Sequence, residues 1–313
     1  MVAASSTSSK KQLRVGCVPE HFSIPFFHAK PTQTSFKVVN CPGGTGQMVK
    51  ALKEGEADIV VALTEGLVAG LAKGEEFTIV GSLTKSPLTW SVAVAPSALQ
   101  EGGAFAGCQN DGNNAQLIRG KRIGISRFGS GSHLITFVIP SVVTPSEEYS
   151  FVQQNDIVGL RSGITTGTTD AFLWERFTTK KYVDSGELAV LGSVTPPWPA
   201  FMFACRNSIL ETQEGRESVR DFLDSVSEAI HLSVYESTVV EGGQKRVQDG
   251  IIPEICERFG YAHADVASWF ETVEFATDCA HVDKASIEKC LTTLKSAGVL
   301  EADAMILESQ LGL

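Results

Sequence analysis

The sequence predicts an α/β protein of two similar lobes, each a mostly parallel sheet flanked by helices. Its 313 residues are enough for two domains at about 150 residues each. Its composition, 43% hydrophobic and 20% charged residues, is that of an ordinary globular chain. The order strand, glycine turn, helix and strand occurs near the start of the chain and again about a hundred residues later. This repetition predicts the two lobes.

The first of these units begins with a strand at residues 13–18, where β-favouring residues alternate, followed by a loop that several prolines break. Residues 36–39 are the second expected strand. The glycine-rich turn 41–46 leads from it into a helix, because apolar residues then recur at helical spacing. Residues 58–63 form a nearly unbroken apolar run, which is typical of a parallel strand covered on both faces, and Thr64 is expected to cap the next helix.

The second unit has the same order. A strand is expected at residues 121–126, a glycine turn at 128–132, a helix at 133–139 that a proline ends, and a strand at 150–153. A short signature supports the repeat, since Gly55-Glu56-Ala57-Asp58 and Gly167-Thr168-Thr169-Asp170 each lead into an apolar strand at the same spacing. The two signatures therefore predict equivalent positions in the two lobes.

Two segments are expected to cross between the lobes. Residues 88–95 form a strand that leaves the first lobe, and residues 195–204 return to it through a proline-rich stretch. From residue 211 onward the apolar periodicity is helical, and these helices need a surface to cover. The division expected is a disordered tail at 1–12, a discontinuous first lobe at 13–95 plus 205–313, and a second lobe at 96–204.

Charge and hydropathy exclude two classes of partner. Acidic residues outnumber basic residues by 36 to 26, and the formal net charge is −10. Such a field repels a phosphate backbone in the absence of a concentrated basic face, so we expect no nucleic-acid partner. No stretch approaches the roughly 20 apolar residues of a membrane helix, and residues 1–12 lack the apolar core of a signal peptide. We therefore expect a cytoplasmic protein with no membrane partner.

The cysteine pattern favours the same compartment. The seven cysteines are an odd number and contain no C-x-x-C pair, which is typical of reduced thiols rather than a disulfide framework. Cys279 and His281 offer two potential metal ligands, too few for a site. We expect neither a metal nor a cofactor.

Two glycine turns are the first candidates for a binding site. In open α/β sheets the ligand lies beyond the carboxyl ends of the strands, where helix N-termini present backbone amides. Gly44-Thr45-Gly46 and Ser130-Gly131-Ser132 both occupy such positions and could hold an anion or a polar oxygen. The alternative is that each is only a tight turn with a helix cap. Neither turn has the spacing of a phosphate-binding P-loop or of the dinucleotide fingerprint.

Aromatic and acidic residues follow neighbouring strands. Aromatic faces there could stack on a flat heterocycle, while carboxylates accept hydrogen bonds from its nitrogens. The sequence contains no G-x-S-x-G or H-E-x-x-H motif and no cysteine in a nucleophile context, so we expect no catalysis. The further candidates are Glu20, His21 and Phe22 after the first strand, Thr64 and Glu65 after the third, and Trp174 and Glu175 in the second lobe.

Three segments together carry a resemblance to a known superfamily. Residues 41–74, 120–139 and 170–199 resemble the type II periplasmic-binding-protein superfamily, in the branch that binds nitrate, sulfonates and thiamine-pyrimidine precursors. The resemblance implies two lobes that close on a small polar ligand by a hinge motion. It places Glu20–Phe22, Gly44–Gly46 and Thr64 on one wall of the cleft. On the other wall it places Ser130–Ser132, Trp174 and Glu175.

Three functions follow as hypotheses. The leading one is non-catalytic binding of a small anionic or heterocyclic metabolite, such as a thiamine-pyrimidine precursor. Partnership with a membrane transporter is disfavoured, since no export signal is present. The chain also resembles fungal enzymes that make the thiamine pyrimidine from pyridoxal phosphate, for which Lys50 or Lys85 would form the Schiff base. A third hypothesis is a repurposed fold that binds a protein partner.

Overall fold

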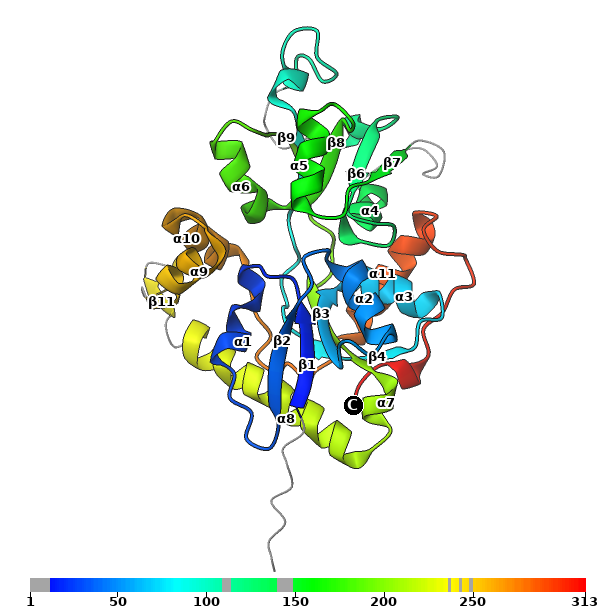
Figure 1. Cartoon of the computed structure of the whole chain (residues 1–313), viewed down its shortest axis with the longest axis vertical. Coiled ribbons are helices and arrows are strands. Elements are labelled where there is room, and N and C mark those ends of the chain that lie inside the picture. Colours follow the sequence, from blue (N-terminus) through cyan, green and yellow to red (C-terminus); the bar gives the residue numbers. More distant parts are fainter. Residues whose placement is uncertain (1–11, 109–113, 140–148, 236–237, 242–243, 248–249) are drawn as a thin grey trace, which may run out of the picture.

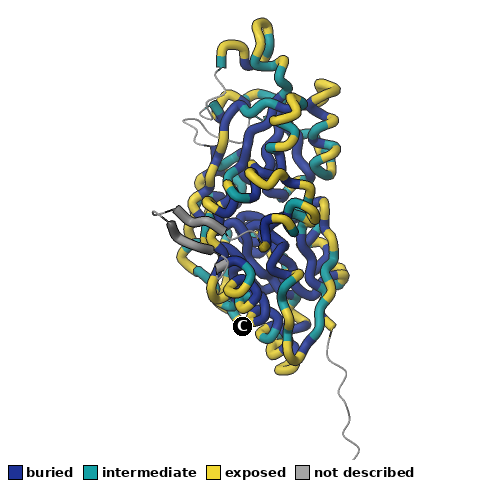
Figure 2. The backbone as a smooth tube through the Cα atoms, turned by 90° about the vertical axis from the view of Figure 1, so that its left-hand side faces the viewer, coloured by how far each residue is buried: buried dark blue, intermediate teal, exposed yellow. Residues whose placement is uncertain are grey.

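The computed structural model describes residues 12–108, 114–139, 149–235, 238–241, 244–247 and 250–313. It has two lobes stacked along the long axis of the molecule, each built on one five-stranded sheet (Figure 1). Both sheets lie in the buried interior of their lobes, and exposed residues lie mainly on the surrounding helices and loops (Figure 2). This architecture confirms the predicted two-lobed α/β fold.

The first sheet has the order β2-β1-β3-β10-β4. Its first three strands are parallel, and β10 runs antiparallel to both of its neighbours. The strand β3 is buried along its whole length, as its apolar run predicts. The strands are β1 Gln12–Cys17, β2 Ser35–Asn40, β3 Ile59–Leu63, β4 Phe77–Ser82 and β10 Phe201–Arg206.

The second sheet repeats this topology in the order β7-β6-β8-β5-β9. Here β5 takes the place that β10 has in the first sheet, antiparallel to both neighbours. Each sheet thus receives one strand directly from a crossing segment. The strands are β5 Trp90–Val94, β6 Arg122–Ile125, β7 Ser150–Gln153, β8 Ala171–Glu175 and β9 Ala189–Val194.

The crossing segments are residues 83–89 and 195–200, since the strands on either side of each belong to different sheets. We place the lobe boundaries there. The division expected from the sequence, after residues 95 and 204, differs from sheet membership by about one strand at each crossing. The physical reason is that β5 and β10 extend the sheets that they enter rather than the sheets that precede them in the chain.

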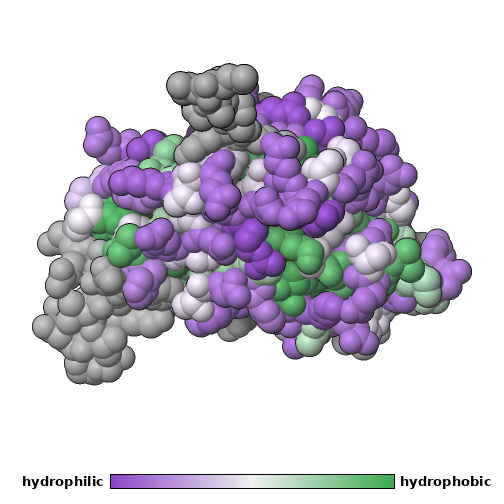
Figure 3. Space-filling model, turned by 90° about the horizontal axis from the view of Figure 1, so that it is seen from below, coloured by the Kyte–Doolittle hydropathy of each residue, from purple (hydrophilic) through white to green (hydrophobic). Residues whose placement is uncertain are grey.

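Helices cover both sheets, and the C-terminal third covers the first lobe (Figure 1). The long helix α8 lies along the lower end of that lobe, with one face buried. That end is mainly hydrophilic around a smaller apolar area (Figure 3). A short hairpin of β11 Thr238–Glu241 and β12 Gln244–Val247 precedes α9. The helices are α1 Ile24–His28, α2 Thr45–Lys53, α3 Thr64–Ala72, α4 Gly131–Leu134, α5 Ile157–Thr165, α6 Arg176–Asp184, α7 Asn207–Leu210, α8 Gln213–Ile230, α9 Ile251–Phe259, α10 His263–Thr272 and α11 Lys284–Ser296.

Three local predictions need correction. The expected loop after β1 contains a 3₁₀ turn and then α1, because Pro25 lies in the first turn of a helix, where its missing N–H costs nothing. The expected helix at residues 133–139 is the single turn α4 followed by a 3₁₀ turn, Ile135–Val138. Thr64 is the first residue of α3, and Leu63 occupies the cap position.

The repeated signature marks the same constellation in both lobes. In the first, the Asp58 carboxylate accepts hydrogen bonds from the backbone N–H and guanidinium of Arg14. In the second, Asp170 accepts the same set from Arg122. Each aspartate fixes the start of its lobe's first parallel strand against the strand that follows the signature. The predicted equivalence of residues 55–58 and 167–170 is therefore a real structural repeat.

Within the described ranges, no helix combines the length and apolar character needed to cross a membrane.

Candidate functional site

A small cavity lies between the lobes, at the carboxyl ends of β1, β3 and β6. Thr45 and Ser130, from the two glycine turns, both line it, so the two turns converge on one space. Its volume is about 40 Å³, room for one or two water molecules. A ligand larger than this does not fit the cavity in the arrangement described. The lining residues are Val18, Glu20, Gly44, Thr45, Leu63, Leu88, Trp90, Ser126, Ser130, Gly131, Ser132, Trp174, Glu175 and Phe201.

Eight of the thirteen residues expected in the site line this cavity, and five do not. The eight are Glu20, Gly44, Thr45, Ser130, Gly131, Ser132, Trp174 and Glu175. The five are His21, Phe22, Gly46, Thr64 and Glu65, each of which has other contacts. These five residues lie close in sequence to residues that line the cavity. On a turn or a helix, however, neighbouring residues direct their side chains differently.

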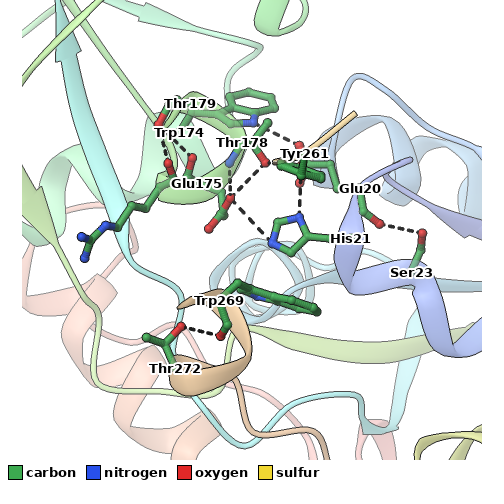
Figure 4. Close-up of polar contacts among 11 residues, drawn as sticks. Glu20, His21, Ser23, Trp174, Glu175, Thr178, Thr179, Tyr261, Trp269 and Thr272 are labelled. Carbon is green, nitrogen blue, oxygen red and sulfur yellow. Dashed lines mark hydrogen bonds and ion pairs between the residues drawn. The ribbon is translucent and has the colours of Figure 1, made fainter. Parts of the chain in front are cut away.

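His21 and Phe22 lie in an aromatic cluster beside the cavity. The His21 ring stands edge-on to Trp269, with ring centroids 4.4 Å apart, and Phe22 packs against the same indole. Burial lowers the pKa of His21 to about 3, so the imidazole is neutral. Its Nδ1 lies 3.1 Å from the hydroxyl of Tyr261, which in turn lies 2.9 Å from the hydroxyl of Thr178 in α6 (Figure 4).

Thr64 and Glu65 bind the returning crossing segment. The Thr64 hydroxyl donates to the carbonyl of Pro199, and the Trp198 indole N–H donates to Oε2 of Glu65 at 3.0 Å. Glu65 is buried, and the loss of water raises its pKa to about 7. These two residues therefore anchor the hinge to the first turn of α3 instead of facing the cavity.

Gly46 belongs to a slot that receives Arg127 from the opposite lobe. A Cβ at Gly46 would lie 2.4 Å from Cδ of Arg127, and one at Gly43 would lie 2.0 Å from its guanidinium. Gly44 has a φ of 74°, a conformation that side chains rarely adopt. The glycines of this turn thus admit the arginine and set the backbone path, which favours the tight-turn reading over a ligand cradle for Gly46.

Two carboxyl groups from opposite lobes face the cavity. Glu20 follows β1, and its Oε1 accepts a hydrogen bond from the Trp174 indole N–H. Glu175 ends β8 and caps α6, where its Oε2 accepts from the backbone N–H of Thr178 at 2.6 Å. Burial raises the pKa of each carboxyl to about 7, and the charge of Glu20 raises that of Glu175 further. Each carboxyl group therefore changes its protonation state near neutral pH.

His21 and Glu175 approach each other without bonding. Nε2 of His21 lies 3.8 Å from Oε2 of Glu175, too far for a hydrogen bond, and it has no hydrogen-bond partner among the described residues. Figure 4 shows that Glu175, Thr178, Tyr261 and His21 surround one point between the lobes. Tyr261 adds a residue from the C-terminal third of the chain, so this network joins three parts of the sequence.

Hydroxyl groups line the floor of the cavity, and several already have structural partners. Thr45 Oγ1 accepts from the backbone N–H of Leu63 at 3.1 Å. Ser132 Oγ accepts from the N–H of Ser126 and lies 2.9 Å from Ser130 Oγ. The turns therefore support themselves through the same hydroxyls that a ligand would use.

Six lining residues were not predicted: Val18, Leu63, Leu88, Trp90, Ser126 and Phe201. Leu63 and Ser126 end or follow parallel strands, so the strand-end rule could have found them. Leu88, Trp90 and Phe201 come from the crossing segments and the strands that they enter. The Trp90 side chain is 3% exposed, and its indole N–H has no partner in the described chain.

The residues considered for a metal or a Schiff base lie apart from the cavity. No group of three or more potential metal ligands occurs among the described residues. Cys279 is buried and His281 is exposed. The two lysines of the pyridoxal-phosphate hypothesis lie outside the cleft, since Lys50 is exposed and pairs with Glu54, and Lys85 pairs with Glu274. Neither lysine lines the cavity.

Comparison with known proteins agrees with this geometry. Residues 104–194 match the model of the Ca3427-like PBP family. No curated protein matches the chain. The Candida albicans CA3427 gene product, described as defining a new family with the generic periplasmic-binding-protein fold, is 29% identical, with a TM-score of 0.77 over 93% of this chain and 92% of that one.

Bacterial binding proteins share the fold at lower identity. The alkanesulfonate-binding protein SsuA from Xanthomonas axonopodis pv. citri, bound to MOPS, is 15% identical, with a TM-score of 0.68 over 97% of this chain and 99% of that one. The nitrate-binding protein NrtA from Synechocystis PCC 6803 is 12% identical, with a TM-score of 0.66 over 94% and 83% of the two chains. The chain therefore has the type II periplasmic-binding-protein fold.

Proposed function

We propose that this protein binds a small heterocyclic molecule carrying N–H groups between its lobes, without catalysis, and that hinge movement encloses the ligand. The observation that carries this proposal is the placement of Glu20 and Glu175 on opposite walls of one cavity. Two carboxyl groups facing each other accept hydrogen bonds from an amine or a ring N–H between them. An aminopyrimidine of the thiamine-precursor type has this donor pattern.

The same carboxyl groups disfavour an anionic ligand. A sulfonate or nitrate placed between Glu20 and Glu175 would meet two groups that are at least partly ionised at neutral pH. Two cations lie near these groups: Lys181, whose charge lowers the pKa of Glu20, and Arg127, which packs against the glycine turn. Neither of them lines the cavity. Of the two ligand classes expected from the sequence, anionic and heterocyclic, the site favours the heterocyclic one.

Trp90 supplies the complementary donor. Its indole N–H is buried and unpartnered in the described chain, and a buried donor without an acceptor costs about 1–3 kcal/mol. A ring nitrogen of the ligand would satisfy it. Trp90 and Trp174 also offer aromatic surface on which a flat ring can stack. Together, these residues match a planar heterocycle with both donors and an acceptor.

Enclosure requires motion, because the closed cavity of about 40 Å³ is smaller than any such ligand. The crossing segments at 83–89 and 195–200 are the connections about which the lobes can separate. We further propose a cytoplasmic site of action. The seven cysteines, all within the described residues, form no disulfide and five of them are buried, which fits a reducing compartment.

The proposal is tested by calorimetry with the full chain and four probes. We expect 4-aminopyrimidine to bind, and unsubstituted pyrimidine, MOPS and nitrate to bind at least about tenfold more weakly, a difference of about 1.4 kcal/mol. Glu175→Gln should weaken 4-aminopyrimidine, whereas Glu257→Gln, an equal charge change on the exposed surface of α9, should not. Tighter binding of MOPS or nitrate than of 4-aminopyrimidine would refute the proposed ligand class.

A further inference from the structure

A second and much larger cavity lies behind the hinge. Its volume is about 610 Å³, within the range of about 300–1,000 Å³ that is typical of small-molecule sites. Both crossing segments line it, and residues 276–286 of the C-terminal third close its other side. This cavity, unlike the cleft, is already large enough for a ligand in the closed arrangement.

The wall formed by the crossing segments is apolar. Pro87 comes from the outgoing segment, and Pro197, Trp198 and Pro199 come from the returning one. Proline rings and an indole have few rotatable bonds, so this wall loses little entropy when a ligand packs against it. Such a wall suits a planar ring.

The opposite side is acidic. Asp278 and Asp283 line the cavity together with His281. The one lysine among the lining residues, Lys85, has its charge opposed by Glu274 at 3.6 Å. The balance of the lining groups is therefore negative. A cation gains from this field, and an anion is repelled by it.

A buried hydroxyl at the same cavity has no partner. Ser82, at the end of β4, lines the cavity and is only 6% exposed. Its Oγ makes no hydrogen bond within the described part of the chain, and such buried polar atoms are uncommon in folded proteins. A donor group on a bound molecule would satisfy this oxygen.

We infer that the cavity behind the hinge is a second binding site, for a small planar organic cation such as an aryl amidine. The ring would pack on Trp198 and the prolines, and the cationic nitrogen would face Asp278 and Asp283. Ser82 would accept one of its N–H groups. The site goes beyond the proposed function, since it shares no lining residue with the cleft.

The two sites nevertheless share a partition. On one side Leu63 lines the cleft, and on the other Trp198 and Pro199 line the hinge cavity. Between them, Thr64 and Glu65 bond directly to Pro199 and Trp198. A molecule in the hinge cavity thus contacts the segment on which movement of the lobes depends.

The test uses benzamidine as the probe and neutral benzamide, of nearly the same shape, as its control. We expect benzamidine to bind the full chain with a Kd of about a millimolar, and benzamide at least about tenfold more weakly. Asp278→Asn and Asp283→Asn together should weaken benzamidine at least about tenfold. Both asparagines keep an oxygen that can accept the backbone N–H bond of Ala280 or Ser286, and at Asp283 the substitution removes only the acceptor of the Ser286 hydroxyl. Thr277→Trp, at an exposed lining position, should block the cavity.

Cleft variants separate this site from the proposed function. Glu20→Gln and Glu175→Gln should leave benzamidine binding unchanged, and Asp278→Asn with Asp283→Asn should leave 4-aminopyrimidine binding unchanged. Weakening of benzamidine by the cleft variants alone would mean that the probe occupies the cleft, and the inference would fail while the proposed function stood. Equal binding of benzamide, or no binding of benzamidine, would overturn the inference as well.

Discussion

The indole N–H of Trp174, in the second lobe, donates a 3.1 Å hydrogen bond to the Glu20 carboxyl, in the first. This contact spans the cleft at the point where a ligand would bind. Burial raises the pKa of Glu20 to about 7, and the bond from Trp174 opposes that rise because it stabilises the ionised form. A ligand amine that reaches Glu20 can bond to its other oxygen, Oε2, or compete with Trp174 for Oε1.

Removing the indole N–H with Trp174→Phe keeps an aromatic ring but breaks this bridge. We expect a coupling free energy of about 1 kcal/mol between positions 174 and 20, from unfolding of Trp174→Phe, Glu20→Ala and the double variant in urea. The coupling should be larger at pH 8 than at pH 6, because hydrogen bonds to a carboxylate are stronger than those to a neutral acid. Strictly additive effects at both pH values would contradict the bridge.

Glu65 predicts a pH-dependent stability of defined sign. Its pKa is raised from the ordinary 4.5 to about 7, so the folded protein binds a proton that the unfolded chain releases in this interval. Glu65 therefore favours folding below about pH 4.5, and this contribution is lost as the pH rises through 7. Glu65→Gln keeps an oxygen for Trp198 and cannot ionise.

The difference between the unfolding free energy of Glu65→Gln and that of the wild type should thus shift in favour of the variant by about 1–3 kcal/mol between pH 4.5 and pH 7. Chemical denaturation at four pH values measures the difference directly. Glu257→Gln, exposed on α9, is the matched control and should track the wild type across the range. A difference independent of pH would show that Glu65 is not the titrating group.

The slot for Arg127 predicts that Gly46→Ala changes stability in opposite directions with and without the arginine side chain. Gly46→Ala places a methyl group 2.4 Å from Cδ of Arg127, which must move, and we expect a loss of about 1–3 kcal/mol in the unfolding free energy. In an Arg127→Ala background the clash disappears. Alanine then favours helix α2 over glycine by about 0.5–1 kcal/mol, so the same substitution should stabilise. Destabilisation of equal size in both backgrounds would exclude the slot.

The repeated Asp–Arg constellation predicts unequal costs in the two lobes. Asp58 is 4% exposed and binds both Arg14 and Arg206. Asp170 is less buried, and its described ion pair is with Arg122. Asp58→Ala leaves two guanidinium groups without their carboxylate and should cost about 3–5 kcal/mol. Asp170→Ala should cost about 1 kcal/mol. Urea denaturation of both variants provides the comparison.

The sequence predicted those features that depend on local pattern. Sequence pattern placed eight of the ten strands of the two large sheets and missed β4 and β9. The repeated signature at residues 55–58 and 167–170 identified equivalent positions. The strand-end rule located the turns around Thr45 and Ser130 that meet at one cavity. In each case the information lies within a few consecutive residues.

Features that depend on contacts between distant segments were not predictable in this way. Nothing near Tyr261 in the sequence marks it as a neighbour of His21, which is 240 residues away. Likewise, Glu65 follows a strand end as Glu175 does, yet it turns toward Trp198 instead of the cavity. The partner of a buried carboxyl is decided by tertiary packing, which a single sequence does not reveal.

The position of β10 between β3 and β4 sets an order for folding during translation. All five strands of the second sheet lie in one continuous stretch, residues 90–194, so that sheet can assemble as soon as this stretch has left the ribosome. In the first sheet, β4 pairs only with β10 among the described strands and must wait more than a hundred residues for it. The lobe that is synthesised first is consequently the one that matures last.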